Sequence, residues 1–132
     1  MKTSDIDVER NILRCLVQLP DFIQSVLLYG QVVENHFSDL FHQNSFNAIK
    51  FYYNKFGTPP TQSKLKSTIL QFITYDKRYE TEDKKYSVKT KQRDIWLKSV
   101  ERLFVVITAD VIREKESDLA MLEEMRKVRL LQ

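Results

Sequence analysis

Residues that form tight turns are scarce in this sequence, and their scarcity limits the folds open to it. The 132 residues include two glycines, Gly30 and Gly57, and three prolines, Pro20, Pro59 and Pro60. β-Sandwiches and β-barrels need many tight turns, whereas long helices need few. Apolar residues make up 42% of the chain and charged residues 30%, a balance typical of globular proteins. We therefore expect an all-α fold in one structural domain.

Apolar residues recur at helical spacing through the first 73 residues and predict a compact bundle of about four helices. We expect helices over residues 7–19 and 21–33, then a third helix capped by Ser38 or Asp39 and a fourth capped by Thr61. In the connector between the second and third helices, Phe37 is expected to be a buried plug. Gly57 is expected to end the third helix.

The second half of the chain divides into a polar segment and a strongly periodic one. Residues 74–93 are mainly charged and polar, and we expect a mobile loop there, with a short helix in part of the segment as the alternative. Residues 94–113 predict a long helix, and the polar stretch 114–118 separates it from a last helix. One unbroken helix over 94–132 is the alternative, because neither glycine nor proline forces a turn. We favour a long C-terminal helical hairpin over 94–132, used for association, after an N-terminal bundle over 1–93.

The expected helix over residues 94–113 is apolar on more than one side, which suggests an interface with another chain. A helix that is apolar on two sides must bury both of them. Either this helix lies at the centre of the bundle or a partner chain covers one side, and the pattern alone leaves both open. The candidate interface residues are Trp96, Val100, Leu103, Phe104, Val105, Val106, Ile107, Val111, Ile112, Leu119, Leu122 and Met125.

Motifs for catalysis or cofactor binding are absent from the sequence. No P-loop is present to hold nucleotide phosphates. His36 and His42 are six positions apart and, with Cys15 distant, provide too few ligands for a closed zinc site, so we interpret them as solvent or connector histidines. Acidic pairs such as Glu123–Glu124 and Glu82–Asp83 lie in highly charged surroundings, unsuited to acid–base catalysis. We expect a chain that is not an enzyme and that has no catalytic, cofactor-binding or metal-binding residues.

The cysteine content and the absence of hydrophobic targeting segments predict a cytoplasmic protein. Cys15 is the only cysteine and lies in an apolar periodic stretch, so we expect a buried small hydrophobe in a reducing compartment. Neither a signal peptide nor an apolar run of about 20 residues is present, so no membrane contact is expected.

A basic stretch with an interleaved tyrosine is a second candidate site. Positive charge beside aromatic rings can hold single-stranded nucleic acid by phosphate attraction and base stacking. A solvated loop is the simpler interpretation and the one we favour, since acidic residues lie just upstream and the net charge is only +3. The possible nucleic-acid contacts are Lys84, Lys85, Tyr86, Lys89, Lys91 and Arg93.

The order of these elements resembles the N-terminal domain of DnaB-type replicative DNA helicases. The run from Val8 to Leu13 looks like the family's opening helix, in which a glutamate precedes an apolar stripe. Residues Val33 to Phe37 are similar to the element that ends the second helix. Phe46, Ile49 and Tyr53 match the third helix, residues 57–61 match a Gly-x-x-Pro turn, and 96–112 lie where the family has the first helix of a long hairpin. The resemblance covers roughly residues 7–120, and the polar insert looks more like phage-encoded members.

The resemblance implies a replication-fork scaffold without the ATPase motor. In the family this domain pairs through its hairpin into a collar above a hexameric ring and receives the primase and sometimes the loader. It implies homo-oligomerisation as a dimer or hexameric collar, weak or indirect DNA contact, and the host cytoplasm if the chain is phage-encoded. The chain ends in mid-pattern over residues 129–132, so we expect it to be part of a longer protein. The resemblance implies that this parent protein is an ATP-dependent DNA helicase. A stand-alone phage helicase adaptor and a weak single-stranded DNA-binding module are the alternatives.

Overall fold

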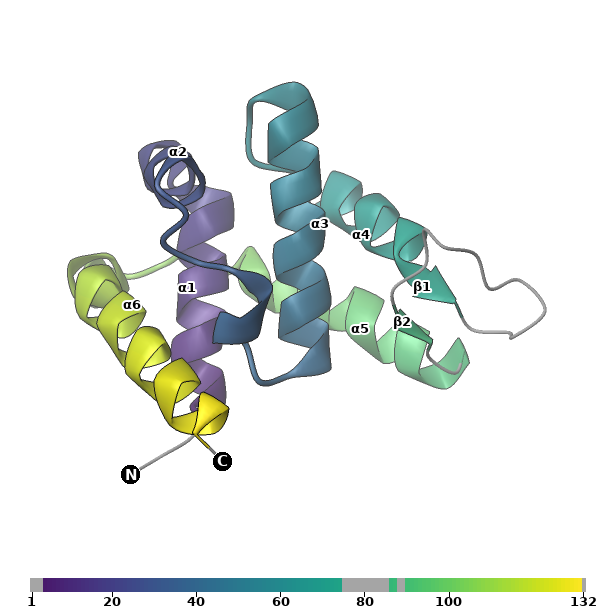
Figure 1. Ribbon diagram of the computed structural model, residues 1–132. Coiled ribbons are helices and arrows are strands. Elements are labelled where there is room, and N and C mark those ends of the chain that lie inside the picture. Colours follow the sequence, from purple (N-terminus) through teal and green to yellow (C-terminus); the bar gives the residue numbers. More distant parts are fainter. Residues whose placement is uncertain (1–3, 75–85, 88–89, 132) are drawn as a thin grey trace.

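The computed structural model describes residues 4–74, 86–87 and 90–131, which form six α-helices and one short 3₁₀ helix, and the all-α class is confirmed (Figure 1). Two strands of two residues each pair in parallel, with Ile73 opposite Tyr86. The elements are α1 (Ile6–Gln18), α2 (Pro20–Leu28), η1 (Glu34–His36), α3 (Leu40–Phe56), α4 (Gln62–Gln71), β1 (Ile73–Thr74), β2 (Tyr86–Ser87), α5 (Thr90–Leu103) and α6 (Ala109–Leu130).

Helix α1 is the centre of the fold and packs against α2, α3, α5 and α6. The helix begins where the Asp5 carboxylate accepts hydrogen bonds from the backbone N–H groups of Asp7 and Val8. Its buried residues cover most of its circumference: Glu9, Ile12, Leu13, Cys15, Leu16 and Val17. A helix surrounded in this way is stabilised mainly by tertiary packing, so the other helices depend on α1 for their position.

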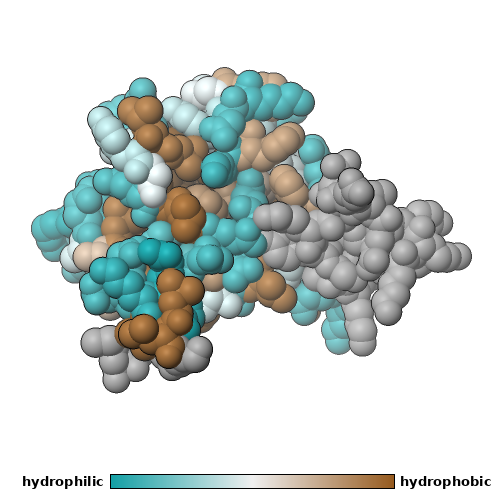
Figure 2. Space-filling view, viewed as in Figure 1, coloured by the Kyte–Doolittle hydropathy of each residue, from teal (hydrophilic) through white to brown (hydrophobic). Residues whose placement is uncertain are grey.

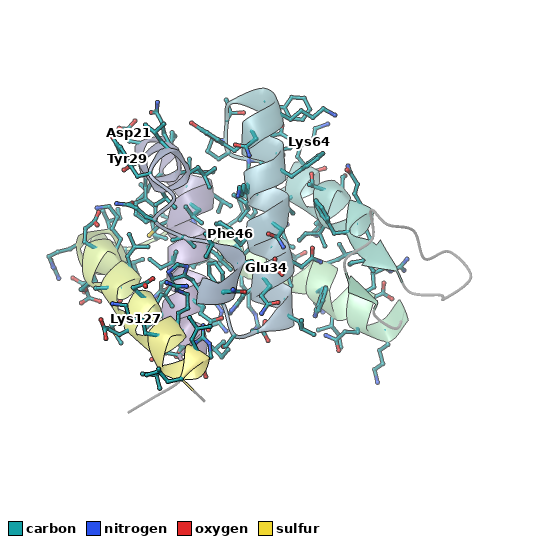
Figure 3. The ribbon with its side chains drawn as sticks, viewed as in Figure 1. Asp21, Tyr29, Glu34, Phe46, Lys64 and Lys127 are labelled. Atoms are coloured by element: carbon teal, nitrogen blue, oxygen red, sulfur yellow. The ribbon has the colours of Figure 1, made fainter. Side chains whose placement is uncertain are left out.

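The caps of α3 and α4 are those expected from the sequence. The Asp39 carboxylate caps α3 by accepting from His42 N–H, and Ser38 has a different role. Gly57 ends α3 with a φ of 75°, a left-handed conformation that glycine adopts without strain. Thr61 caps α4 as expected. Phe37 is buried and packs on Phe46, which lies between α1 and α3 (Figure 3).

Two expected boundaries are wrong. Helix α2 ends at Leu28 and not at residue 33, because the chain turns at Gly30, whose φ of 60° does not continue a helix. Helix α5 begins at Thr90, so residues 90–93 of the expected loop are helical. The rest of that loop lies outside the described residues, except for Thr74 of β1 and for Tyr86 and Ser87 of β2.

The C-terminal region differs most from expectation. The chain leaves α5 after Leu103 and enters α6 at Ala109, so the break lies within the expected helix 94–113, and the polar stretch 114–118 lies inside α6. Thr108 sets the start of α6 by accepting from Val111 N–H. The two helices do not fold back on each other as a hairpin. Helix α6 packs antiparallel along α1, while α5 packs on α1 and α4 (Figure 1).

Candidate functional site

The turn between α5 and α6 is held by two side chains of α1. The Gln18 amide donates through Nε2 to the carbonyl oxygens of Leu103 (3.0 Å) and Val105 (2.7 Å), and its Oε1 accepts from Ile107 N–H (3.1 Å). Arg14 Nη2 donates to the carbonyl oxygens of Val105 and Val106 at 3.1 and 3.2 Å. Both N–H groups of the Gln18 amide and one of the two lone pairs of its oxygen are used on this turn. The turn is therefore fixed in shape although it contains neither glycine nor proline.

Two valine side chains project from this fixed turn into solvent. Val105 is 59% exposed and Val106 is 80% exposed. An apolar side chain is not stabilised by contact with water. Covering it with a partner's apolar surface contributes about 25 cal/mol to the free energy of association for each Å² removed from water. Because the backbone beneath is already ordered, a partner would not have to order it on binding.

A shallow pocket lies between the start of α2 and the first turns of α6, near the same end of α1. Its volume is about 370 Å³, and it includes apolar side chains of Leu19, Phe22 and Ile112 and the ring of Pro20. Lys115, Glu116 and Asp21 lie at the same pocket and supply charge of both signs. An apolar floor with charged residues around it is the usual composition of a protein-binding surface. We call Val105, Val106 and this pocket the α5–α6 surface.

Most of the interface residues expected from the sequence are used inside the chain. Trp96, Val100, Leu103, Ile107, Leu122 and Met125 are buried in the hydrophobic core. Phe104, Val111, Ile112 and Leu119 are partly buried and pack against that core. Of the twelve candidates, Val105 and Val106 alone are exposed. The apolar side chains of this region therefore pack mainly against α1. The candidate interface is reduced to the α5–α6 surface.

Hydrophobic side chains are also exposed elsewhere on the surface. Figure 2 shows them over α2 and near the carboxyl end of α6, where Leu28, Leu130 and Leu131 are exposed. None of the helices in the described ranges is both long and apolar enough to cross a lipid bilayer.

The basic stretch can be placed only in part. Lys84, Lys85 and Lys89 lie outside the described residues, and Tyr86 is described as a residue of β2 through its backbone alone. Lys91 is exposed on the first turn of α5. Arg93 donates through Nε and Nη2 to Asp94 Oδ1 at 3.1 and 2.9 Å. Its charge is thus partly neutralised by a neighbour on the same helix.

Both histidines are buried, so the expectation that they face solvent is wrong, although His36 lies in the connector between α2 and α3. His42 Nδ1 lies 2.9 Å from Glu9 Oε1, and Glu9 is completely buried on α1. Glu9 Oε2 also accepts from Ser38, at 2.6 Å from its Oγ and 3.1 Å from its N–H. Burial raises the pKa of Glu9, but the hydrogen bonds from His42 and Ser38 outweigh it and leave the pKa below its ordinary value. The charged carboxylate therefore ties α1 to the start of α3.

His36 makes the corresponding link to α6. Its Nδ1 accepts from Val33 N–H at 2.9 Å, so Nε2 carries the proton and donates to Glu123 Oε2 at 2.5 Å. Arg126 donates to both oxygens of Glu123. Arg126 and, after it, His36 lower the pKa of Glu123 to about 2. Glu123 therefore has fixed hydrogen-bond partners within the protein, whereas a solvated carboxylate was expected. The other acidic pair, Glu82 and Asp83, lies outside the described residues.

Sequence reasoning missed these two carboxylates because their partners are distant in the chain. Glu9 looks like an ordinary acid in the first turn of a helix, and Ser38 and His42 lie 29 and 33 residues further on. The one sequence feature that could have indicated them is that two histidines and a serine lie close together at the connector between apolar helices.

The remaining candidates for chemistry are inert in this arrangement. Cys15 is buried as expected, and burial raises the pKa of its thiol to about 11, which disfavours the reactive thiolate. Among the residues that the structure describes, no three His, Cys, Asp or Glu side chains are grouped so as to hold a metal ion.

Comparisons with protein-family models, with curated proteins and with solved structures find no match to this chain.

Proposed function

We propose that this chain is a non-catalytic assembly and partner-docking domain of a DnaB-type replicative helicase. In this proposal it contributes to the collar of the oligomer and to contacts with the primase or loader. The α5–α6 surface carries the proposal, because Gln18 and Arg14 hold Val105 and Val106 in place and leave them uncovered. The order of sequence elements described above supports the choice of family.

Single charged substitutions test the surface directly. We expect sedimentation of the wild-type chain to show a dimer or larger species, and Val105→Glu or Val106→Lys to shift it to monomer. A buried charge without a partner costs several kcal/mol, whereas the same charge in water costs almost nothing. Because both valines are exposed, circular dichroism should show unchanged helicity in both variants.

A control separates this surface from general apolar exposure. Phe56, 57% exposed, is the last residue of α3 and does not belong to the α5–α6 surface, so Phe56→Glu should leave the assembly state unchanged. A surface of this size predicts weak pairing, so the runs should reach about 100 µM, which corresponds to about 5–6 kcal/mol. Wild-type mass retained in both valine variants would reject the surface, and a wild-type monomer throughout would reject self-association by this chain.

Two binding experiments separate the proposal from its alternatives. The isolated chain should give a flat calorimetric titration with Mg-ATP, since the sequence contains no P-loop. Fluorescence anisotropy with a labelled single-stranded oligonucleotide should show little binding at physiological salt. Micromolar binding that weakens steeply with salt would instead favour the single-stranded DNA-binding module.

A further inference from the structure

A second pocket lies between α1, α3 and α5, and its chemistry differs from that of the α5–α6 surface. Its volume is about 220 Å³, and its lining includes Ile6, Phe41, Trp96 and Leu103. The rings of Phe41 and Trp96 lie 6.0 Å apart between centroids and form an aromatic wall. The amino ends of α1 and α3 meet at this end of the molecule (Figure 1). The apolar part is large enough for one aromatic or aliphatic group.

Positive charge exceeds negative charge around this pocket. Arg10 and Arg102 both line it, and Asp39 is the one acidic residue among the lining residues. Asp39 is already engaged as the cap of α3. Arg10 uses Nη1 on Asp7 at 3.1 Å, while Arg102 is exposed and makes no ion pair with the residues that the structure describes. Arginine presents several N–H groups in one plane, which matches the oxygens of a carboxylate or phosphate.

His42 adds a buried polar group to the same pocket. Its side chain is 4% exposed, and Nδ1 is bound to Glu9, an ionised carboxylate that can only accept. Nδ1 therefore carries the proton, and Nε2 is left as an acceptor, which cannot donate to an oxyanion. We therefore give His42 no part in binding the anion.

We propose that this pocket binds an oxyanion, either a carboxylate or a phosphate monoester, that is attached to an apolar or aromatic group. Arg10 and Arg102 contact the oxyanion, and Phe41 and Trp96 contact the attached group. The proposal does not depend on the α5–α6 surface, because none of these four residues belongs to it.

Trp96 makes the proposal directly measurable, since it is the only tryptophan in the chain. Its fluorescence should change saturably on titration with phenyl phosphate, with phenylacetate, or with both, and the pattern identifies the preferred oxyanion. Benzyl alcohol, a neutral compound of similar size, should bind at least tenfold more weakly. Equal binding of benzyl alcohol, or no saturable change with either anion, would overturn the proposal.

Variants of the charged residues complete the test. Arg102→Gln removes an exposed guanidinium and should weaken the binding of the better anion about tenfold, the equivalent of roughly 1.4 kcal/mol. Arg113→Gln, an exposed residue of α6 paired with Asp110, is the matched control and should have no effect. Unchanged affinity in Arg102→Gln would show that no oxyanion is recognised here.

Discussion

Helices α1 and α6 run antiparallel beside each other but hold their places by different means. The thirteen residues of α1 bury six side chains that cover most of its circumference. The twenty-two residues of α6 fully bury only three, Asp118, Leu122 and Met125, along one stripe. Helix α6 is therefore peripheral, and its position depends on α1 and on polar links such as that between His36 and Glu123. Length along the chain is a poor guide to a helix's share in stability, and the number of its packed faces is a better one.

The largest expected effect comes from removing the buried carboxylate of α1. Glu9→Ala leaves the His42 ring and the Ser38 hydroxyl and N–H without their acceptor, and should lower the free energy of unfolding by about 3–5 kcal/mol. Glu124→Ala on α6 is the matched control. Glu124 is exposed and paired only with Lys127, at 3.6 Å, so the loss should stay below about 1 kcal/mol. Urea denaturation measures both, and similar losses would contradict the difference drawn between the two helices.

An intermediate loss of stability is expected from changing the α1 side chain that bonds to the turn before α6. Gln18→Ala removes two donors and one acceptor from the α5–α6 turn. We expect a loss of about 2 kcal/mol, since each net hydrogen bond contributes about 0.5–1.5 kcal/mol. Gln18→Glu should be similarly harmful because a carboxylate cannot donate to carbonyl groups. Hydrogen exchange should show faster exchange at Ile107 N–H in both variants, and unchanged protection would contradict the proposed role of Gln18.

The smallest loss of stability at neutral pH, and the one that depends most on pH, is expected from changing Glu123 of α6. The pKa of Glu123 is lowered to about 2 from its ordinary value of 4.5. A lowered pKa stabilises the folded state fully above the ordinary value, and this contribution is lost as the pH falls from about 4.5 towards 2.

The comparison between variants isolates this contribution from that of Glu9, whose pKa is lowered as well. Glu123→Gln should be slightly less stable than the wild type at neutral pH, and the difference should shrink as the pH approaches 2. Thermal unfolding at a series of pH values measures it. A difference that is constant with pH would mean that the charge of Glu123 contributes nothing.

Local signals in the sequence predicted much of the fold correctly. The scarcity of turn residues indicated the all-α class, and Gly57 and Thr61 marked the end of α3 and the start of α4 as expected. These features depend only on residues that are adjacent in the chain, so they can be predicted from a short stretch of sequence.

The break between α5 and α6 was missed because its cause is not local. Phe104 to Ile107 continue the apolar spacing of α5, yet Gln18 and Arg14 hold their backbone in a turn from more than 80 residues away. The polar stretch 114–118 suggested a break, but a polar run also suits the solvent-facing turns of a peripheral helix such as α6. Thr108 followed by Asp110 was the one local sign of the true start.

The packing of α6 along α1 also bears on how the chain folds during synthesis. Arg14 bonds to Val106, 92 residues later, and Arg129 donates to the Asn35 carbonyl oxygen across 94 residues. Contacts between such distant residues form slowly because a long loop must close first. On the ribosome the face of α1 that α6 covers stays open until α6 itself has emerged. A nascent chain that stops before Leu122 would therefore present uncovered apolar surface of the central helix, which is a target for chaperones and a cause of aggregation.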